Sequence, residues 1–441
     1  MKSSSIFGVL IVAALAAIGF FYLRDMRGPE VSLSPGPGPV SGKAEMAVSL
    51  HDPGSGMKKL SIIALQGQRT ITVLSREYPP KTYTARESFR LAETPSLKDG
   101  PFKLEVSSND RALYHLGAGN RTVKAIDYTY QNKPPAVTAL SIAHNIARGG
   151  VGLVIYTVNR EVQKTGVVFA DRFFPGYHQF GDVYACLFPF PYNLPTERFV
   201  PKILAVDRAG NERVTGIYFH LIPKAFPSDR IQLPDTYLDK VSAEFKDRFP
   251  QANTPLEIFL KANRDLRVHD LKQLEEVGKK TSPTFLWEGP FLRMPNSAPR
   301  GGYAQFRDYY YHGKLVDQET HLGIDLAALA HAKVPAANRG KIVYADDLGI
   351  YGQCVIIDHG LGLQTLYGHL SGIGVKVGED VQKGQIIGTT GDTGLAGGDH
   401  LHFGVMVSGE QVNPIEWWDP SWINNNITSK LQDAKETAKA R

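Results

Sequence analysis

Two short segments in the C-terminal half of the chain carry side chains that can hold a metal ion. The first contains His321 and, four residues later, Asp325, and the second contains His400 and His402. Imidazole nitrogens and carboxylate oxygens are ligands of zinc, and a catalytic zinc site uses three protein ligands with a fourth position left to water. These residue types therefore indicate a zinc hydrolase. The zinc-protease motif H-E-x-x-H does not occur in the sequence.

The second segment has the alternating pattern of a half-buried strand. Residues 400–407 read HLHFGVMV, with polar and apolar residues in turn at the start. Alternate side chains of a strand share a face, so His400 and His402 would point into a cleft while Leu401 and Phe403 enter a core. Two imidazoles on one face need not both bind metal, because one can be a ligand while the other faces the substrate.

A third segment lies between the first two and supplies another histidine. Residues 355–357 and 363–367 have the composition of two strands, and the sequence DHGLG at 358–362 is typical of the turn between them. His369 would then lie at the end of the second strand, where it can face a cleft. Asp358 and His359 in the turn could support the site from behind or be purely structural.

Residues from about 290 to 420 resemble a LytM/lysostaphin-type zinc metalloendopeptidase domain. The resemblance rests on the motifs HLGIDLA, GKIVYA, YGQCVIIDHGLGLQTLYGHLS, VKVGEDVQKGQIIGTTGDTG, and HLHF followed by VNP. The family hydrolyses peptide bonds in bacterial peptidoglycan. The resemblance therefore implies an all-β catalytic domain, a bound zinc ion and peptidoglycan as the substrate.

The resemblance also implies a role for each of the five residues. Zinc would be held by His321, Asp325 and His402, and the catalytic histidines beside the metal-activated water would be His369 and His400. Zinc polarises a scissile carbonyl and lowers the pKa of bound water toward about 7. One of the two catalytic histidines would take a proton from that water or stabilise the oxyanion. The sequence does not divide these roles between them.

Some positions near the site differ from the common family pattern. Many relatives have Ser-Thr-Gly-Pro before the H-x-H motif, where this chain has LAGGD at 395–399, and many have Glu where this chain has Gly404. For this reason no cleavage specificity is transferred. Some relatives have lost metal ligands and act only as activators of other wall enzymes, whereas this chain keeps all five residues. The alternatives to a peptidoglycan endopeptidase are a non-catalytic wall-binding activator and a zinc endopeptidase of protein substrates.

The composition fits a modular protein of the cell envelope. The 441 residues leave room for about three domains. The formal charge of +5 suits binding near an anionic wall, but no dense Lys/Arg patch indicates nucleic-acid binding. The two cysteines, Cys186 and Cys354, fall in different predicted domains, so we expect no disulfide between them.

Residues 1–27 are expected to be an N-terminal signal anchor. The uncharged run 6–23 would make a helix roughly 27 Å long, close to the apolar thickness of a membrane. A cleaved signal peptide is the alternative, because ALA at 14–16 resembles a cleavage site, although the apolar run continues beyond it. Since peptidoglycan lies outside the inner membrane, we expect a single-pass protein of the bacterial inner membrane with its catalytic domain in the periplasm.

Two predicted β-rich regions follow the anchor. Residues 28–42 are rich in Pro, Gly and Ser and are expected to be a linker. Regions 43–131 and 132–224 show short alternating strands with turn signals, and each has the size of an immunoglobulin-like sandwich. These regions could bind the wall or a protein partner, or they could be a spacer or an inhibitory cover.

A helical connector is predicted over residues 225–285, because apolar residues recur there at three- and four-residue spacing. It could lie across the catalytic domain and restrict the cleft. The peptidase domain would then cover 286–424, with a charged tail at 425–441. The expected fold is mainly β, with a C-terminal all-β peptidase domain preceded by two β-sandwich-like domains, the connector and an N-terminal transmembrane helix.

Overall fold

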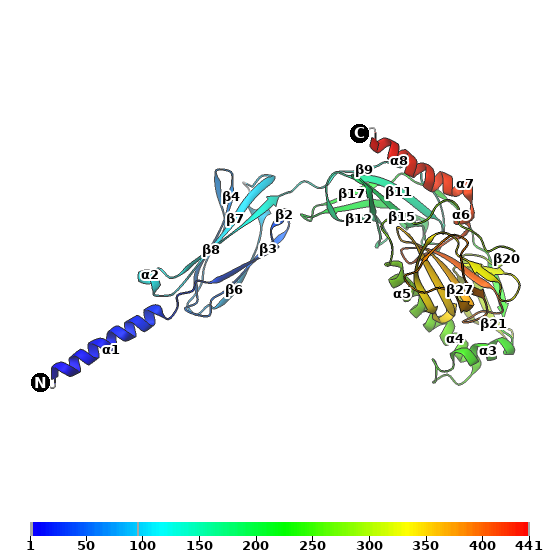
Figure 1. The fold of residues 1–441 in the computed structure, drawn as a ribbon, viewed down its shortest axis with the longest axis horizontal. Helices are drawn as coiled ribbons and strands as arrows, with labels where there is room; N and C mark the ends of the chain where they lie inside the picture. Colours follow the sequence, from blue (N-terminus) through cyan, green and yellow to red (C-terminus); the bar gives the residue numbers. More distant parts are fainter. Residues whose placement is uncertain (1–2, 95–96, 440–441) are drawn as a thin grey trace. The chain divides into compact units, whose positions relative to one another are not determined.

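The computed structural model describes residues 3–94 and 97–439. These residues form two compact units, both built mainly from β-strands (Figure 1). The first unit holds the chain up to Pro135, together with the short segments Glu161–Gln163 and Val206–Glu212. The second unit holds the rest of the chain, and it contains all five candidate site residues.

The first unit begins with helix α1 (Ser3–Leu23), which includes the apolar run at 6–23. Within residues 3–94 and 97–439, no helix has the length and apolar content needed to cross a membrane. A helix is therefore observed at this position, whereas the transmembrane helix expected there is not supported.

Two sheets enclose the core of the first unit. The three-stranded sheet has the order β1 (Glu30–Ser34), β3 (Glu45–His51) and β6 (Thr84–Arg90). The five-stranded sheet has the order β2 (Gly38–Val40), β8 (Arg121–Tyr130), β7 (Gly100–Asp110), β4 (Met57–Gln66) and β5 (Arg69–Glu77). Alternate residues of β4, Leu60, Ile62 and Ala64, are buried in a core that both sheets share. The short helices η1 (Leu91–Glu93) and α2 (Tyr114–Gly117) lie in the connections.

The prediction of a linker at residues 28–42 is wrong, because this segment contains strands β1 and β2. Strand β1 pairs with β3, and β2 pairs with β8. Both are edge strands of their sheets. Proline is compatible with an edge strand, where it need not donate a ladder hydrogen bond. The Pro/Gly-rich composition indicated an extended chain correctly, but it did not reveal that this chain joins a sheet.

The second unit starts with a pair of sheets that have four strands each. One has the order β14 (Tyr177–Phe180), β15 (Val183–Pro189), β11 (Val151–Val158) and β9 (Val137–Ala139). The other has the order β13 (Arg172–Pro175), β12 (Val162–Phe169), β16 (Lys202–Asp207) and β17 (Glu212–Gly216). A separate parallel pair joins β10 (Asn145–Ala147) to β18 (His220–Ile222), and η2 (Thr196–Arg198) precedes β16.

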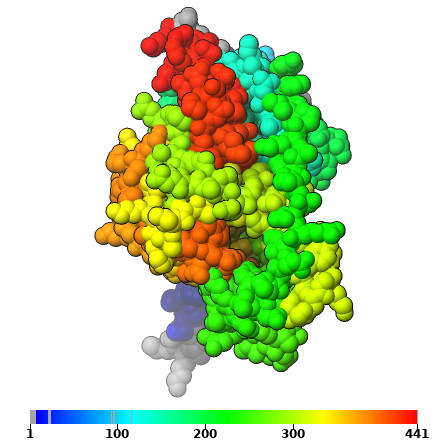
Figure 2. All heavy atoms as spheres, turned by 90° about the vertical axis from the view of Figure 1, so that its right-hand side faces the viewer, coloured from blue at the N-terminus to red at the C-terminus, as the bar shows by residue number. Residues whose placement is uncertain are grey.

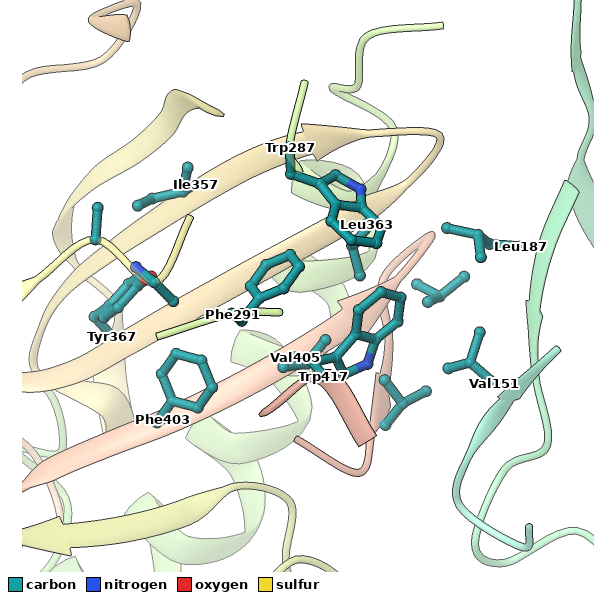
Figure 3. Packing of buried hydrophobic residues seen from close by; sticks show 14 of the residues in the cluster. Val151, Leu187, Trp287, Phe291, Ile357, Leu363, Tyr367, Phe403, Val405 and Trp417 are labelled. Atoms are coloured by element: carbon teal, nitrogen blue, oxygen red, sulfur yellow. The ribbon is translucent and has the colours of Figure 1, made fainter. Parts of the chain in front are cut away.

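One sheet of this region packs directly on the C-terminal region that is predicted to be the peptidase domain. Alternate residues of β11 and β15, such as Val151 and Leu187, share a core cluster with Trp287, Phe291 and Trp417 (Figure 3). The aromatic rings meet edge to face, with the Trp287 and Trp417 centroids 5.7 Å apart. The sequence pattern separates these regions into two domains, but a shared apolar core joins them.

The helical part of the predicted connector, 225–285, consists of α3 (Asp235–Phe245), α4 (Pro255–Lys261), the π-helical turn η3 (Ala262–Leu266) and α5 (Arg267–Gly278). Ser228–Gln232, in the same range, forms strand β19 and is not helical as predicted. The side chain of Thr254 caps α4 by accepting a hydrogen bond from the backbone N–H of Glu257. Buried residues of all these helical segments form a second core cluster with the sheet of the peptidase domain. The helices therefore pack on this sheet and do not form a free linker.

The peptidase domain is built on one large sheet. Its main path has the order β20 (Ala298–Gly301), β23 (Ile324–Ala327), β30 (Leu401–Val407), β27 (Leu363–Ile373), β26 (Gln353–Gly360), β25 (Gly340–Asp347) and β28 (Asp380–Val381). Three strands pair off this path, β24 (Lys333–Pro335), β29 (Ile386–Thr390) and β31 (Glu410–Val412). A smaller sheet contains β19 (Ser228–Gln232), β21 (Gln305–Tyr311) and β22 (Lys314–His321), and η4 (Gly349–Tyr351) precedes β26.

Both faces of the large sheet are covered. Leu401, Phe403 and Val405 of β30 enter the core cluster shared with the preceding β-rich region, as the alternating pattern predicts. Met406 enters the cluster shared with the connector helices, and His402 lies on this same face because strand residues alternate. The connector therefore covers the sheet face that carries the candidate site.

The C-terminal segment is helical and packed. It contains α6 (Ile415–Trp418), α7 (Pro420–Ile423), the π-helical turn η5 (Asn424–Thr428) and α8 (Ser429–Lys439). Lys430 in α8 is buried, and its Nζ donates to the carbonyl oxygen of Leu153 at 3.2 Å. The charged tail expected at 425–441 is therefore part of the folded unit over its described residues.

Candidate metal centre and active-site cleft

His321, Asp325 and His402 come from three neighbouring strands. His321 ends β22, and Asp325 lies in β23 after the connection formed by Leu322 and Gly323. Strand β23 pairs with β30 in a register that places Asp325 opposite His402. A side chain at position 323 would place its Cβ atom 2.4 Å from His402 Nε2, so the connection needs glycine to admit the imidazole.

The three side chains form a small triangle of ligand atoms. His321 Nε2 lies 3.0 Å from His402 Nδ1 and 2.9 Å from Asp325 Oδ1, and His402 Nδ1 lies 3.2 Å from Asp325 Oδ1. All three residues are buried. Tetrahedral zinc, with bonds of about 2.0–2.2 Å, needs ligand atoms roughly 3.3 Å apart. The triangle therefore has the size and the donor set of a zinc site.

The hydrogen bonds around the triangle leave it in need of a cation. His321 Nδ1 lies 2.9 Å from the Gly302 carbonyl oxygen, so Nδ1 carries the proton and Nε2 offers a lone pair. When His321 is neutral, this lone pair faces a carboxylate oxygen of Asp325 without a proton between them, so the contact needs either a second proton on His321 or a cation. Among the described residues, His402 Nε2 is buried and has no hydrogen-bond partner. A metal ion bound to all three groups would remove this repulsion.

The carboxyl group of Asp325 is held in its charged form. Burial alone would raise its pKa, but the charge and hydrogen bonds of the surrounding imidazoles, His321 first, lower the pKa well below its ordinary value. Its second oxygen, Oδ2, accepts a hydrogen bond from Arg307 Nη2 at 2.9 Å. A charged carboxylate is the form that binds zinc, and the Arg307 contact fixes its orientation.

His369 and His400 face the same cavity as the triangle. His369 Nδ1 lies 2.8 Å from the Thr393 carbonyl oxygen, and His400 Nδ1 lies 2.7 Å from the Gly398 carbonyl oxygen. Both Nε2 atoms are thereby left to accept protons. The two rings are 4.9 Å apart, and His400 Nε2 is 3.4 Å from Asp325 Oδ1. The arrangement therefore provides two bases beside the triangle.

His369 has an unusual backbone conformation, and the pKa values of His369 and His400 are shifted in opposite directions. His369 has φ +60°, a conformation that few non-glycine residues adopt. It lies within β27 (Leu363–Ile373) and not at the end of the strand as predicted, because the strand continues beyond residue 367. Burial first, and then the neighbouring His400 and His402, lower the pKa of His369 well below its ordinary value. For His400, burial lowers the pKa, but Asp325 and the Gly398 carbonyl raise it above its ordinary value.

A cavity of about 430 Å³ surrounds the five residues. The connector supplies one wall of it, with residues that include Leu233, Tyr237, Phe259, Asn263 and Arg267. Figure 2 shows this helical segment, in green, against the yellow and orange surface of the peptidase domain. The structure therefore places the connector at the edge of the cleft.

Helix α3 is also fastened to the loop that leads into His400. Tyr237 Oη donates to the Leu395 carbonyl oxygen at 3.2 Å, and Lys240 Nζ donates to the Ala396 carbonyl oxygen at 3.0 Å. Lys240 also forms an ion pair with Asp392 at 2.8 Å. Since three contacts hold one short loop, the position of this loop depends on α3.

Arg307 is a residue of the site that the sequence motifs do not reveal. It lies on β21, and it reaches Asp325 only because β21 pairs with β22 and brings both strands to the cleft. Its segment, QFRDYYY, gives no local signal for a metal centre. Its position could be predicted only from the pairing of the two strands.

Asp358 and His359 are structural. Both lie in β26, and the turn of the hairpin is made by Leu361 and Gly362. His359 Nδ1 lies 2.8 Å from the Arg339 carbonyl oxygen and Nε2 lies 2.8 Å from Thr365 Oγ1, while burial lowers its pKa to about 4. The prediction that these two residues occupy the turn is wrong, because the strands extend further than their apolar residues indicate.

Comparisons with known proteins agree with this geometry. Residues 319–414 match the model of Peptidase family M23. The chain is 39% identical over 107 residues to the DD-carboxypeptidase/endopeptidase Mpg of Neisseria meningitidis, covering 24% of this chain and 25% of that protein. It is 38% identical over 96 residues to the peptidoglycan DD-endopeptidase ShyA of Vibrio cholerae, covering 22% of each.

A third similar protein is named as an activator of hydrolases and not as a peptidase. The murein hydrolase activator EnvC of Escherichia coli is 36% identical over 95 residues, which cover 22% of this chain and 23% of that protein. The chain thus spans about a quarter of the length of each of these relatives. The C-terminal region of this chain is therefore a domain of peptidase family M23, of the LytM type.

Proposed function

We propose that this chain is a zinc-dependent endopeptidase that hydrolyses peptide cross-links of bacterial peptidoglycan. The proposal rests on one observation above all, the triangle of His321, Asp325 and His402 beside the bases His369 and His400. The similarity to ShyA, a peptidoglycan DD-endopeptidase, supports the choice of substrate. A buried site with this donor set matches a hydrolytic zinc centre that keeps a position for water.

In this proposal, some residues of the cleft bind the metal ion and others transfer protons. Zinc, when bound by His321, Asp325 and His402, would act as a Lewis acid and activate water. His369 Nε2 and His400 Nε2 would accept a proton from the attacking water and return it to the leaving amine. Their Nδ1–H groups, held by backbone carbonyls, fix both rings in the tautomer that this task needs.

The substrate can be tested by digesting isolated peptidoglycan with the purified chain. We expect new uncross-linked muropeptides, their loss after treatment with a zinc chelator and their return when zinc is added back. Zinc-loaded protein that releases no such products would contradict the proposed substrate. Cleavage of unfolded proteins under the same conditions would favour an endopeptidase of protein substrates.

An activator of other wall hydrolases is the second candidate function, favoured by the similarity to EnvC and by the connector at the cleft. The five complete site residues argue for catalysis by the chain itself. The two functions differ in one experiment, because an activator would release products only in the presence of a second hydrolase, and His369→Ala would leave that effect intact.

The proposed substrate also implies a location. Peptidoglycan lies outside the inner membrane, so we propose a periplasmic peptidase domain, attached to the inner membrane through residues 6–23. Fractionation of cells, followed by protease treatment of intact spheroplasts, tests both statements. A chain recovered with cytoplasmic proteins, or protected from protease in spheroplasts, would contradict the location.

A further inference from the structure

A second cluster of acidic side chains lies in the first unit. Asp25 follows helix α1, Asp52 follows strand β3, and Asp110 ends strand β7. One carboxylate oxygen from each residue lies within 4.8 Å of the other two. Asp52 is 2% exposed and Asp110 is fully buried. The cluster therefore gathers three segments, far apart in sequence, at one point in the interior.

Backbone N–H groups hold each carboxylate in place. Asp110 Oδ1 accepts from the N–H groups of Ala112 at 3.0 Å and Asn120 at 2.6 Å, and Asp110 Oδ2 accepts from Asn120 Nδ2 at 2.6 Å. Asp25 Oδ2 accepts from the N–H of Ser55 at 2.6 Å. These contacts orient the carboxylates, but they bring no full positive charge to them.

The two carboxylate oxygens of Asp52 differ in their hydrogen bonds. Asp52 Oδ1 accepts from the N–H of Gly54 at 2.9 Å. In the part of the chain that the structure describes, the other oxygen, Asp52 Oδ2, is buried and has no hydrogen-bond partner. A buried carboxylate oxygen without a partner is costly, and two neighbouring carboxylates add repulsion. Among residues 3–94 and 97–439, none of these three carboxylates forms an ion pair with a lysine or arginine side chain.

The cationic side chain that follows Asp110 in sequence does not fill this role. Arg111 follows Asp110 directly, but its Nη2 donates to the carbonyl oxygen of Tyr78. Asn120 contributes only a neutral amide, whose Nδ2 also contacts the carbonyl oxygens of Asp25 at 3.1 Å and Arg27 at 3.5 Å. Backbone carbonyl oxygens thus gather beside the carboxylates, and oxygen is the only ligand type in the cluster.

Two glycines keep the space around the carboxylates free. A Cβ atom on Gly54 would lie 2.2 Å from Asp25 Oδ2. Gly119 has φ +80°, and its Cβ atom would lie 2.5 Å from the Asp110 carbonyl oxygen and 2.7 Å from Asp110 Oδ1. The backbone approaches the carboxylates so closely that only glycine fits at either position.

We propose that Asp25, Asp52 and Asp110 form a binding site for a calcium ion. Hard divalent cations bind carboxylate and carbonyl oxygens, whereas zinc and softer metals favour the nitrogen and sulfur ligands that this cluster lacks. Calcium accepts six to eight oxygens in a flexible geometry, while magnesium demands a regular octahedron and retains several waters. Three carboxylates fixed by the fold, with carbonyl oxygens beside them, fit calcium better.

Calcium would then tie the start of the chain to the β-structure of the first unit. Asp25 lies between α1 and β1, Asp52 lies directly after β3, and Asp110 is the last residue of β7. Bound calcium would thus stabilise the connection between α1 and the sheets. This role is independent of the peptidase site, and it does not depend on the proposed function.

Calcium binding can be measured on the full chain after treatment with a calcium-selective chelator. We expect one calcium ion per chain by isothermal titration calorimetry and a higher midpoint of thermal unfolding when calcium chloride is added. Asp52→Asn, which keeps the shape of the side chain, should abolish both effects. The matched control Asp127→Asn, at an exposed position of β8, should keep both effects.

A second variant and a second metal complete the test. Asp25→Asn changes the half-buried member of the cluster, outside the sheets, and should abolish binding without affecting folding. Without calcium, Asp52→Asn should unfold at a higher temperature than the unchanged chain, because it removes repulsion. The proposal would be overturned if both cluster variants bound calcium as tightly as the unchanged chain, or if the unchanged chain bound none. A heat of binding with magnesium chloride but not with calcium chloride would also overturn it.

Discussion

At the scale of single residues, the contact between Arg307 and Asp325 predicts an effect on metal affinity. Arg307 donates to the carboxylate oxygen that faces away from the triangle. Removal of such a supporting contact typically weakens metal binding roughly 10–100-fold. We expect Arg307→Ala to lower zinc affinity by that factor, measured by competition with a chromogenic chelator. Arg300→Ala, another cavity residue, is the control, and equal affinities in the two variants would contradict the assigned role.

His369 is expected to act in catalysis and not in metal binding. Its Nε2 faces the cavity, while its Nδ1 is held by the Thr393 carbonyl. Loss of a general base typically costs roughly 10²–10⁴ in rate. His369→Ala should therefore retain zinc and lose kcat by that factor, while His331→Ala, an exposed histidine, should change neither. Loss of zinc from His369→Ala would show that this residue is a ligand.

The sequence predicts the five site residues because their motifs are local and specific. The structure places all five around one cavity. The sequence does not predict Arg307, whose position depends on how β21 pairs with β22. Nor does it predict the calcium cluster, because Asp25, Asp52 and Asp110 belong to no motif and meet only in the folded unit.

At the scale of elements, the contacts of α3 predict that the connector restricts the cleft. Lys240 and Tyr237 hold the loop that leads to His400, and the connector forms one wall of the cavity. Lys240→Met should loosen this loop and raise the rate of peptidoglycan cleavage several-fold, with zinc content unchanged. Lys246→Met, an exposed position next to the same helix, is the control.

A lower rate of peptidoglycan cleavage in Lys240→Met would show that α3 supports catalysis and does not restrict the cleft. The helix would then build the cleft, and the loop it holds would be needed to position His400. The rate on a short soluble peptide separates the two outcomes. A restricting wall should affect large peptidoglycan more than a short peptide, whereas a misplaced His400 should slow both reactions equally.

Elements with a clear period are predictable from sequence, and their partners are not. The alternation of HLHFGVMV correctly assigns Leu401 and Phe403 to the core and the histidines to the other face. The prediction fails for residues 28–42, where edge strands have the composition of a linker. The helical period of the connector predicts helices, but their place at the cleft depends on contacts with the large sheet.

At the scale of the whole molecule, Glu416 links one of the two four-stranded sheets to the peptidase domain. Its Oε2 accepts a hydrogen bond from the N–H of Val151 at 3.0 Å. Burial raises the pKa of Glu416 to about 8, against the opposing effects of this N–H and of Lys224. The folded chain therefore keeps a proton at neutral pH that the unfolded chain releases.

This proton predicts how stability depends on pH. Between the ordinary pKa of 4.5 and the folded-state pKa of about 8, the folded state binds more protons, so stability falls as pH rises through this window. The loss is roughly 1.4 kcal/mol for each pKa unit. Denaturant unfolding at pH 5 and pH 8 should show this fall, and Glu416→Gln should reduce it.

The exposed residue Glu436 provides the control for this prediction. It lies on α8, and Glu436→Gln should retain the pH dependence of the unchanged chain. The same fall in stability in Glu416→Gln would contradict the role of this buried proton. The link itself was not predictable from sequence, because the pattern of the β-rich region gives no sign that one of its sheets shares a core with Trp287 and Trp417.

The central claim is that His321, Asp325 and His402 bind the zinc ion on which peptidoglycan hydrolysis depends. Its most direct test is to measure zinc content and muropeptide release in the same preparations of the unchanged chain and His402→Ala. We predict near-stoichiometric zinc and new uncross-linked muropeptides in the unchanged chain, with both lost in His402→Ala. Full zinc content and undiminished cleavage in His402→Ala would contradict the account.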